Sequence, residues 1–413
     1  MSQLIERRQY MQMLRDLKDR YIVKVITGVR RCGKSTLLRM FADELLQDGV
    51  LSEQVQFYNF EARATRAIGS WKDIYNHIKD RLIPDKMNYV FLDEVHLVDI
   101  FHCLVDRLFM KKNVDLYVVG SNAYFLSDKF ASLFARRYYE IAVLPLQFSE
   151  YHDFTATETS NMSKMESLEN YLIEGGVPEY FNRKNIGQKE ADEFMRGVLS
   201  TIIKKDIFTL LKIKKKRKNR RNFNKMIYYI FDSIGSFSLP NTISNTLHAI
   251  GMPMSKTVIA RYLDALCDMF LLYRVPHIEI RSNEVLHTFH KYYFVDPCFR
   301  KVCFLRQNMQ YDITYWLENM VYFELLRRNR DVRVGLIDNK EIDFVATDHS
   351  GYTSYYQVSW STVNKEVLVR ELAPLKLVKN SNPKYLLTMD IDSNPVYNND
   401  IRKLNIVDWL LDK

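Results

Sequence analysis

Cysteine is scarce in this chain of 413 residues, and long apolar runs are absent from it. The five cysteines form an odd number and include no C-x-x-C pair, which argues against a disulfide framework and against a zinc site. No apolar run approaches the roughly 18 residues that would span a bilayer, and no secretory apolar segment follows the charged N-terminus. We therefore expect a soluble, cytoplasmic protein without a membrane partner.

Acidic residues are fewer than basic ones, and the basic excess is concentrated in one block. The 59 lysines and arginines exceed the 50 aspartates and glutamates by nine. Eight of these positive charges lie together, so the rest of the chain is near neutral. A block of this kind is either a solvated, mobile loop or a surface that binds nucleic-acid phosphates, and composition leaves both open. The basic block consists of Lys212, Lys214, Lys215, Lys216, Arg217, Lys218, Arg220 and Arg221.

Glycine is also rare, with 13 residues in the whole chain, so a motif built on two glycines stands out. Residues 27–36 read T-G-V-R-R-C-G-K-S-T and contain G-x-x-x-x-G-K-[ST], the phosphate-binding P-loop. Gly28 and Gly33 let backbone N–H groups approach phosphate oxygens. Lys34 would lie against the β- and γ-phosphates, and the Ser35 hydroxyl would bind Mg²⁺.

The segments on either side of this motif have the patterns that a P-loop requires. Residues 21–26 are β-branched and apolar, which is typical of a buried strand. Apolar residues at helical spacing over 36–46 predict a helix whose N-terminus adds partial positive charge. We expect Cys32 to be a small filler in the loop rather than an oxidisable thiol. The motif predicts ATP as the ligand, bound by Gly28, Val29, Arg30, Arg31, Cys32, Gly33, Lys34, Ser35 and Thr36.

Two adjacent carboxylates follow an apolar run about sixty residues later. Residues 89–94 read Y-V-F-L-D-E, the pattern of a Walker B strand. Asp93 would complete the Mg²⁺ shell, and Glu94 would orient and polarise the attacking water. An acidic turn after an ordinary strand is the alternative, and the P-loop upstream makes it the weaker interpretation.

Three further polar residues are candidates for contact with the γ-phosphate. A buried strand at 115–120 ends in Ser121 and Asn122, and we assign Asn122 a sensing role over that of a turn former. Arg136 and Arg137 precede a last strand at 138–144. Either arginine could reach a γ-phosphate in the same chain or in a neighbouring subunit of a homo-oligomer. A surface arginine pair is an equally good interpretation.

The alternation of strands and helices over residues 1–151 predicts a three-layer α/β domain with a mostly parallel sheet. The nucleotide should lie at the carboxyl ends of its strands. A helical region, residues 152–222, contains the turn E-G-G-V-P-E-Y and ends in the basic block.

We expect residues 223–302 to form a compact helical module, because two short helices there have the spacing of a helix-turn-helix. If double-stranded DNA binds there, Lys256, Thr257 and Arg261 would begin the recognition helix. Strands near 270–273 and 291–295 would form a wing. Packing, or contact with a protein partner, is the alternative use of this module.

These motifs together resemble those of prokaryotic AAA-type P-loop ATPases with a C-terminal domain of unknown function. The likeness covers nearly the whole chain and includes T-G-V-R-R-C-G-K-S-T, F-L-D-E-V-H, V-G-S-N, E-G-G-V-P-E-Y, V-D-P and E-I-D-F-V-A. It implies that Arg137 takes the place of the arginine that precedes the last strand in the family. The basic block is a departure from these relatives.

The C-terminal part, residues 303–413, is similar to the PD-(D/E)xK nuclease fold. The resemblance implies a weak Mg²⁺ site made of Glu318, Asp343 and Gln357. Ser359 stands where such nucleases carry lysine, so we expect a nuclease-like domain with little or no cleavage activity. It could still bind nucleic acid or a partner.

Three functional hypotheses follow. The first is an ATPase that needs Mg²⁺ and moves its C-terminal domains, on DNA in one version. The second is a nucleotide-gated switch that binds DNA or protein and turns over negligibly. The third is an ATP-regulated, Mg²⁺-dependent nuclease.

Overall fold

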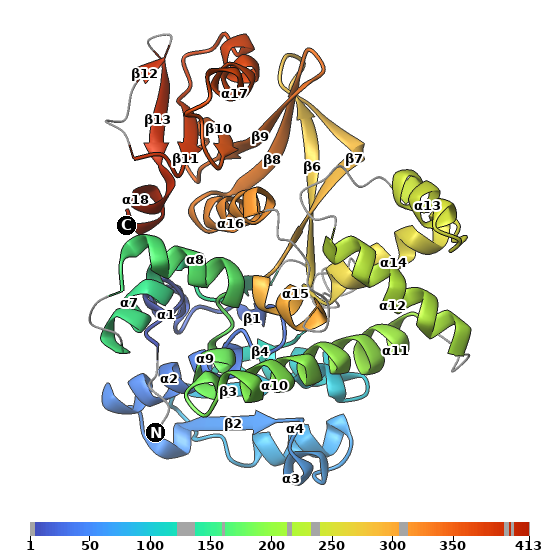
Figure 1. Cartoon of the computed structure of the whole chain (residues 1–413). Helices are drawn as coiled ribbons and strands as arrows, with labels where there is room; N and C mark the ends of the chain where they lie inside the picture. Colours follow the sequence, from blue (N-terminus) through green and yellow to red (C-terminus); the bar gives the residue numbers. More distant parts are fainter. Residues whose placement is uncertain are drawn as a thin grey trace. The chain divides into compact units, whose positions relative to one another are not determined.

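The computed structural model divides the chain into two compact units, which Figure 1 shows as ribbons. It describes residues 5–121, 137–158, 162–212, 217–232, 240–304, 313–391, 396–397 and 400–412. Unit 1 comprises Met1–Pro145, Val177–Asn182 and Asp268–Phe270. Unit 2 comprises Leu146–Gly176, Arg183–Cys267 and Leu271–Lys413.

Unit 1 is built on a five-stranded sheet in the order β2-β3-β4-β1-β5, with every neighbouring pair parallel. Parallel strands buried on both faces are apolar throughout, and β1, β3 and β4 are fully buried. The strand that leads into the P-loop is therefore separated from the Walker B strand by one strand, β4. The five strands are β1 (Val23–Thr27), β2 (Val55–Asn59), β3 (Asn88–Asp93), β4 (Val114–Val119) and β5 (Tyr138–Ala142).

Helices cover both faces of this sheet. On one face, Ile74, Leu104 and Leu108 from α4 and α5 pack against strand residues such as Val90. On the other face, the Phe41 ring of α2 lies 5.5 Å from that of Tyr117 in β4. The predicted three-layer α/β fold is confirmed. The helices are α1 (Arg8–Leu17), α2 (Lys34–Gln47), α3 (Arg63–Arg66), α4 (Trp71–Lys79) and α5 (Phe101–Phe109), with α9 (Pro178–Lys184) beginning in unit 1.

Unit 2 contains an eight-stranded mixed sheet in the order β12-β13-β11-β10-β9-β8-β6-β7. Its apolar face packs under α17 through residues such as Ile342, Leu375 and Leu386. The strands are β6 (Leu272–Glu279), β7 (Glu284–Phe294), β8 (Asp331–Ile337), β9 (Lys340–Thr347), β10 (Thr353–Ser359), β11 (Lys384–Thr388), β12 (Val396–Tyr397) and β13 (Ile401–Asn405).

This sheet corrects two of the expectations for the second half of the chain. The hairpin predicted as a wing is β6 and β7, and β6 pairs with β8 along His277–Glu279. The hairpin is therefore the edge of the large sheet, and no domain boundary falls at 302. The predicted segments 152–222, 223–302 and 303–413 belong to one unit, apart from the two short segments that cluster with unit 1.

The remaining helices of unit 2 carry the candidate DNA-binding positions. Residues 217–221 of the basic block lie on α12, so this part of the block is helical and not a loop. Among the described residues, no helix is both long and apolar enough to span a bilayer. The helices are α7 (Phe148–Glu158), α8 (Lys164–Glu174), α10 (Gln188–Thr201), the π-helix at Ile202–Ile207, α11 (Phe208–Leu210), α12 (Arg217–Asp232), α13 (Pro240–Ala249), α14 (Lys256–Asp268), α15 (Pro297–Phe304), α16 (Ile313–Arg328), α17 (Lys365–Leu377) and α18 (Ile406–Leu411).

Candidate active site

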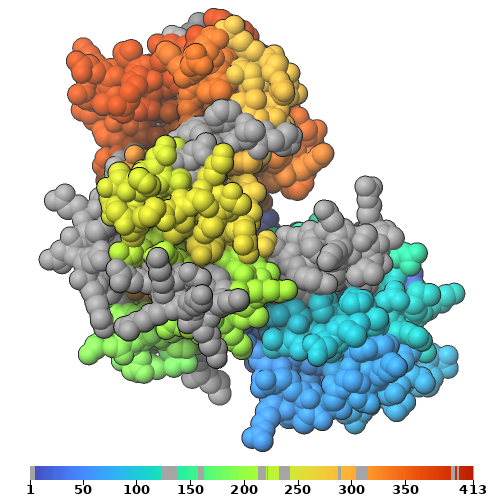
Figure 2. All heavy atoms as spheres, turned by 90° about the vertical axis from the view of Figure 1, so that its right-hand side faces the viewer, coloured from blue at the N-terminus to red at the C-terminus, as the bar shows by residue number. Residues whose placement is uncertain are grey.

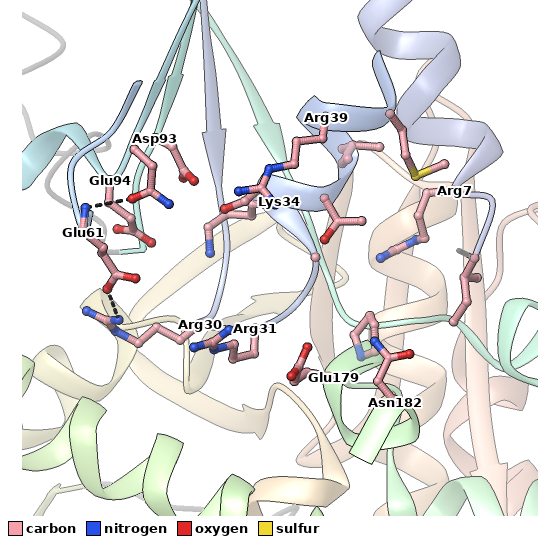
Figure 3. Close-up of a pocket in the computed structure, with 18 of the residues that line it drawn as sticks. Arg7, Arg30, Arg31, Lys34, Arg39, Glu61, Asp93, Glu94, Glu179 and Asn182 are labelled. Carbon is pink, nitrogen blue, oxygen red and sulfur yellow. Dashed lines mark hydrogen bonds and ion pairs between the residues drawn. The ribbon is translucent and has the colours of Figure 1, made fainter. Parts of the chain in front are cut away.

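A pocket of about 550 Å³ lies in unit 1 at the carboxyl end of β1. The P-loop, the end of the Walker B strand and the start of α9 line it. In Figure 3, Lys34 lies between the acidic pair Asp93 and Glu94 on one side and Arg7 on the other. The predicted P-loop and Walker B residues therefore meet in one cavity.

The two P-loop glycines occupy conformations that other residues rarely adopt. Gly28 has φ of 139° and Gly33 has φ of 103°. A Cβ atom on Gly28 would lie 2.2 Å from the carbonyl oxygen of Val143. Glycine is therefore required at position 28 by backbone conformation and by the space available, which explains why the turn can be so tight.

Lys34 is the first residue of α2, and its side chain is buried under the loop. Its Nζ donates hydrogen bonds to the carbonyl oxygens of Gly28 at 2.8 Å and Val29 at 2.9 Å. The ammonium group is thus held at the N-terminus of a 14-residue helix, where anions are favoured.

Not every predicted P-loop side chain faces the pocket. Val29 and Cys32 are fully buried, and the Cys32 Sγ donates to the carbonyl oxygen of Val143 at 3.1 Å. Both residues pack the loop against the core, as expected for Cys32. The residues of the predicted loop that do line the pocket are Arg30, Arg31, Gly33, Lys34, Ser35 and Thr36.

Asp93 ends β3 and lies in the pocket with no exposed surface. Neither carboxylate oxygen has a hydrogen-bond partner among the described residues. Burial raises the pKa of Asp93, while the nearby Ser35 hydroxyl and the charge of Lys34 oppose that rise. A buried carboxylate whose oxygens accept no hydrogen bond of good geometry is costly, and a divalent cation shared with Ser35 would satisfy it. The residues therefore fit Mg²⁺.

Glu94 follows directly and has a left-handed backbone, with φ of 55°. Its Oε1 accepts a short hydrogen bond from the Ser121 hydroxyl, and its Oε2 lies 3.2 Å from Nδ1 of His96. The carboxylate is thus held by the hydroxyl of Ser121 at the end of β4, with the His96 ring beside its other oxygen. Asn122, the predicted sensor, lies outside the described residues. Its neighbour Ser121 makes the contact that links the two strand ends.

Several lining residues were not predicted as site residues. Arg39 lies one helical turn after Ser35 on α2, so helical spacing from the P-loop could have identified it. Arg30 forms an ion pair with Glu61 at 2.9 Å, and the Glu61 backbone N–H donates to Asn59 at 2.8 Å. Arg30, Arg39 and Glu61 therefore place charged side chains beside the P-loop.

The other end of the pocket receives residues from distant parts of the sequence. Arg7 precedes α1, and its guanidinium donates to the carbonyl oxygens of Leu144 at 2.9 Å and Cys32 at 3.4 Å. Glu179 and Asn182 lie on α9, directly after the E-G-G-V-P turn (Figure 3). That turn was noticed in the sequence, but nothing local connected it with the P-loop.

Arg137 lies at the amino ends of β5 and β1, whereas the P-loop lies at the carboxyl end of β1. Its carbonyl oxygen accepts from the N–H of Val23, and Tyr138 pairs with Val23 at the beginning of both strands. The P-loop follows the other end of β1, at Thr27. This register argues against contact with a γ-phosphate in the same chain. A role toward a neighbouring subunit stays a prediction.

In unit 2, the structure brings together the residues predicted for the nuclease-like site. The N–H of Asp343 donates to Oε1 of Gln357 at 3.4 Å. The charge of Glu318 is close enough to raise the pKa of Asp343, after the larger effect of burial. Ser359 donates to the carbonyl oxygen of Ser361 and supplies no cation. A lysine that was not predicted, Lys291 of β7, lies against Glu318.

The sheet order, the P-loop and the acidic pair at the end of β3 define an AAA-type P-loop domain. Residues 20–152 match a family model described as "AAA domain", and residues 165–308 match one described as a domain of unknown function. The whole chain belongs to the same family as an uncharacterized protein of Haemophilus influenzae, which is 31% identical over 415 residues and 99% of each chain.

The chain is also similar to a second relative and to solved structures at lower identity. An uncharacterized protein of Methanocaldococcus jannaschii is 26% identical over 347 residues, which cover 80% of this chain and 72% of that protein. The Walker-type ATPase of Pyrococcus abyssi is similar with a TM-score of 0.48 and 16% identity, over 73% of this chain and 96% of that one. DnaA of Aquifex aeolicus bound to AMPPCP is similar with a TM-score of 0.31 and 14% identity, over 62% and 86%.

Proposed function

We propose that the protein binds ATP with Mg²⁺ in the unit 1 pocket and hydrolyses it, with Glu94 as the general base. One observation carries this proposal. A single cavity holds the P-loop lysine, a buried carboxylate without a partner at Asp93, and a second carboxylate, Glu94, fixed by Ser121. These are the parts that phosphoryl transfer to water requires.

The phosphate groups would lie over the N-terminus of α2. Lys34 would exchange its hydrogen bonds to the Gly28 and Val29 carbonyls for bonds to the β- and γ-phosphates. Ser35 and Asp93 would hold Mg²⁺, which neutralises charge on the phosphate oxygens. Glu94 would accept a proton from the attacking water, because it stands next to Asp93 at the same strand end.

The nucleoside would lie toward the end of the pocket formed by Arg7, Met40, Pro178 and Asn182. Met40 and Pro178 provide apolar surface for a base. The Asn182 amide provides a donor and an acceptor for its edge. This arrangement supports a nucleoside triphosphate as the ligand, with the phosphates at Lys34.

Hydrolysis would change the position of unit 2. One feature of unit 2 supports contact with DNA. Lys256, Thr257 and Arg261 are exposed at the start of α14, and Figure 2 shows the α13–α14 segment in yellow at the surface. A duplex bound by these side chains would be read by a helix N-terminus, the common docking geometry of helix-turn-helix proteins.

The test is ATP turnover and ATP binding by the parent protein and by Glu94→Gln, each with and without double-stranded DNA. Glutamine keeps the size of the side chain but cannot accept the proton, so we expect ATP to bind and turnover to fall at least about a hundredfold. Glu53→Gln, at an exposed site outside the pocket, is the matched control.

Normal turnover in Glu94→Gln would remove Glu94 from its role. ATP binding without turnover in the parent protein would instead favour the nucleotide-gated switch. Turnover that does not respond to DNA would direct attention to a protein partner.

A further inference from the structure

Unit 2 contains a buried lysine beside acids that the sequence resemblance predicts as metal ligands. Lys291 lies on β7, with its side chain 4% exposed. Its Nζ lies 2.7 Å from Oε1 of Glu318 on α16 and 2.8 Å from Oε1 of Glu341 on β9. One ammonium group therefore bridges two carboxylates from different elements of the unit.

The remaining polar groups complete this arrangement. The Tyr293 hydroxyl, two residues along β7, donates to the same Glu318 oxygen at 2.6 Å. Asp343 accepts the backbone N–H of Val358 at 2.8 Å, and its charge contributes to the raised pKa of Lys291. Glu318, Glu341 and Asp343, named here the acid cluster, thus surround a fixed positive charge.

A divalent cation would have to compete with this charge. Mg²⁺ binds carboxylate oxygens at about 2.1 Å in near-octahedral geometry. The Glu318 oxygen already receives an ammonium and a phenol hydroxyl, and two cations held by one carboxylate repel each other.

The effects of the lysine on its neighbours agree with a stable ion pair. Burial would raise the pKa of Glu341, but His277 beside it and the charge of Lys291 lower that pKa to about 2. Burial would lower the pKa of Lys291, yet the charges of Glu318, Asp343 and Glu341 raise it overall. The two carboxylates within 2.8 Å of its Nζ therefore stabilise the ammonium form of Lys291.

We propose that Lys291 is a built-in cation that takes the place of a divalent metal in the acid cluster, so that unit 2 does not carry out metal-dependent cleavage. The proposal is independent of ATP hydrolysis in unit 1.

The experiment measures Mn²⁺ binding by the electron paramagnetic resonance signal of the free ion. It compares the parent protein, Asp343→Asn, Lys291→Met and the double variant Lys291→Met/Asp343→Asn. We expect the parent and Asp343→Asn to bind Mn²⁺ alike. Lys291→Met should gain one site, at least about tenfold tighter than any in the parent, and the added Asp343→Asn should abolish it.

Lys384→Met is a matched control for the loss of a buried lysine. Lys384 lies on β11 of the same sheet, with its side chain 1% exposed, and pairs with the single carboxylate of Asp400 at 2.6 Å. Removing it leaves no group of acids, so no Mn²⁺ site should appear.

Three results would overturn the proposal. The first is Mn²⁺ binding in the parent protein that Asp343→Asn weakens. The second is a folded Lys291→Met variant without a new site. The third is Mg²⁺-dependent nicking of plasmid DNA by the parent protein that Lys291→Met abolishes, which would make the lysine catalytic. If Lys291→Met does not fold, the parent and Asp343→Asn comparison decides the question.

Discussion

Replacing Ser121 with alanine would remove the hydroxyl group that holds the proposed general base. Ser121 follows β4, is buried, and donates its hydrogen bond to Oε1 of Glu94. It does not line the nucleotide pocket. We therefore expect Ser121→Ala to slow hydrolysis while leaving the affinity for ATP unchanged.

The expected fall in kcat follows from the negative charge of Glu94, which accepts the hydrogen bond from Ser121. Removing a buried hydrogen bond to a charged group costs roughly 1.5–3 kcal/mol. If the bond is needed to place Glu94 in the transition state, kcat should fall roughly 10- to 150-fold. If the nearby His96, at 3.2 Å from Oε2, limits the movement of Glu94, the fall in kcat should lie at the lower end of that range.

Steady-state ATP turnover gives kcat, and calorimetric titration of the nucleotide gives Kd. Ser52→Ala is the control, because the Ser52 hydroxyl also donates to a carboxylate, Glu53 at 3.1 Å, on an exposed surface. The reasoning fails if Ser121→Ala keeps kcat within about twofold of the parent value. It also fails if Kd rises by the same factor as kcat falls, because Ser121 would then act on nucleotide binding.

Two other substitutions test the P-loop turn and the ion pairs of unit 2. Gly28→Ala should abolish ATP binding in calorimetry, because its Cβ would lie 2.2 Å from the Val143 carbonyl oxygen; Gly49→Ala also has positive φ but open space, and should bind normally. Burial would raise the pKa of Asp390, but the Lys403 ammonium and hydrogen bonds from Ser361 and Thr362 lower it overall. Its stabilising contribution is therefore complete above the unfolded pKa of about 4 and is lost as pH falls below that value. In urea unfolding, the free-energy difference between parent and Asp390→Asn should shrink from pH 7 to pH 3; a difference that stays constant would contradict the assignment.

The sequence was sufficient for the features that are local. The P-loop and the pair Asp93 and Glu94 each occupy consecutive positions, and the strand and helix patterns around them are determined by short-range periodicity. Their meeting in one pocket follows from the parallel sheet, whose carboxyl strand ends share an edge. For this reason the nucleotide site and the fold of unit 1 could both be predicted.

Contacts between distant segments could not be read in the same way. Lys291 precedes Glu318 by 27 positions and reaches it only because β7 and α16 belong to one unit. The hairpin of β6 and β7 has the local pattern of a wing. Its place in the large sheet depends on pairing with β8, a strand about fifty residues further along the chain. Arg7 likewise reaches the P-loop from before the first helix, with no motif to mark it.

The two acidic sites of the chain differ in how each carboxylate is neutralised. Asp93 is buried, has no hydrogen-bond partner among the described residues, and faces a pocket beside a serine hydroxyl. Glu318 is also buried, but an ammonium and a phenol hydroxyl from its own unit satisfy it. The desolvation of Asp93 is opposed only in part by Ser35, Lys34 and Arg39 and leaves the carboxylate open to a cation from solution, whereas that of Glu318 is offset within the fold. Dependence on a divalent cation should therefore belong to unit 1, although both units contain acids that resemble metal ligands in the sequence.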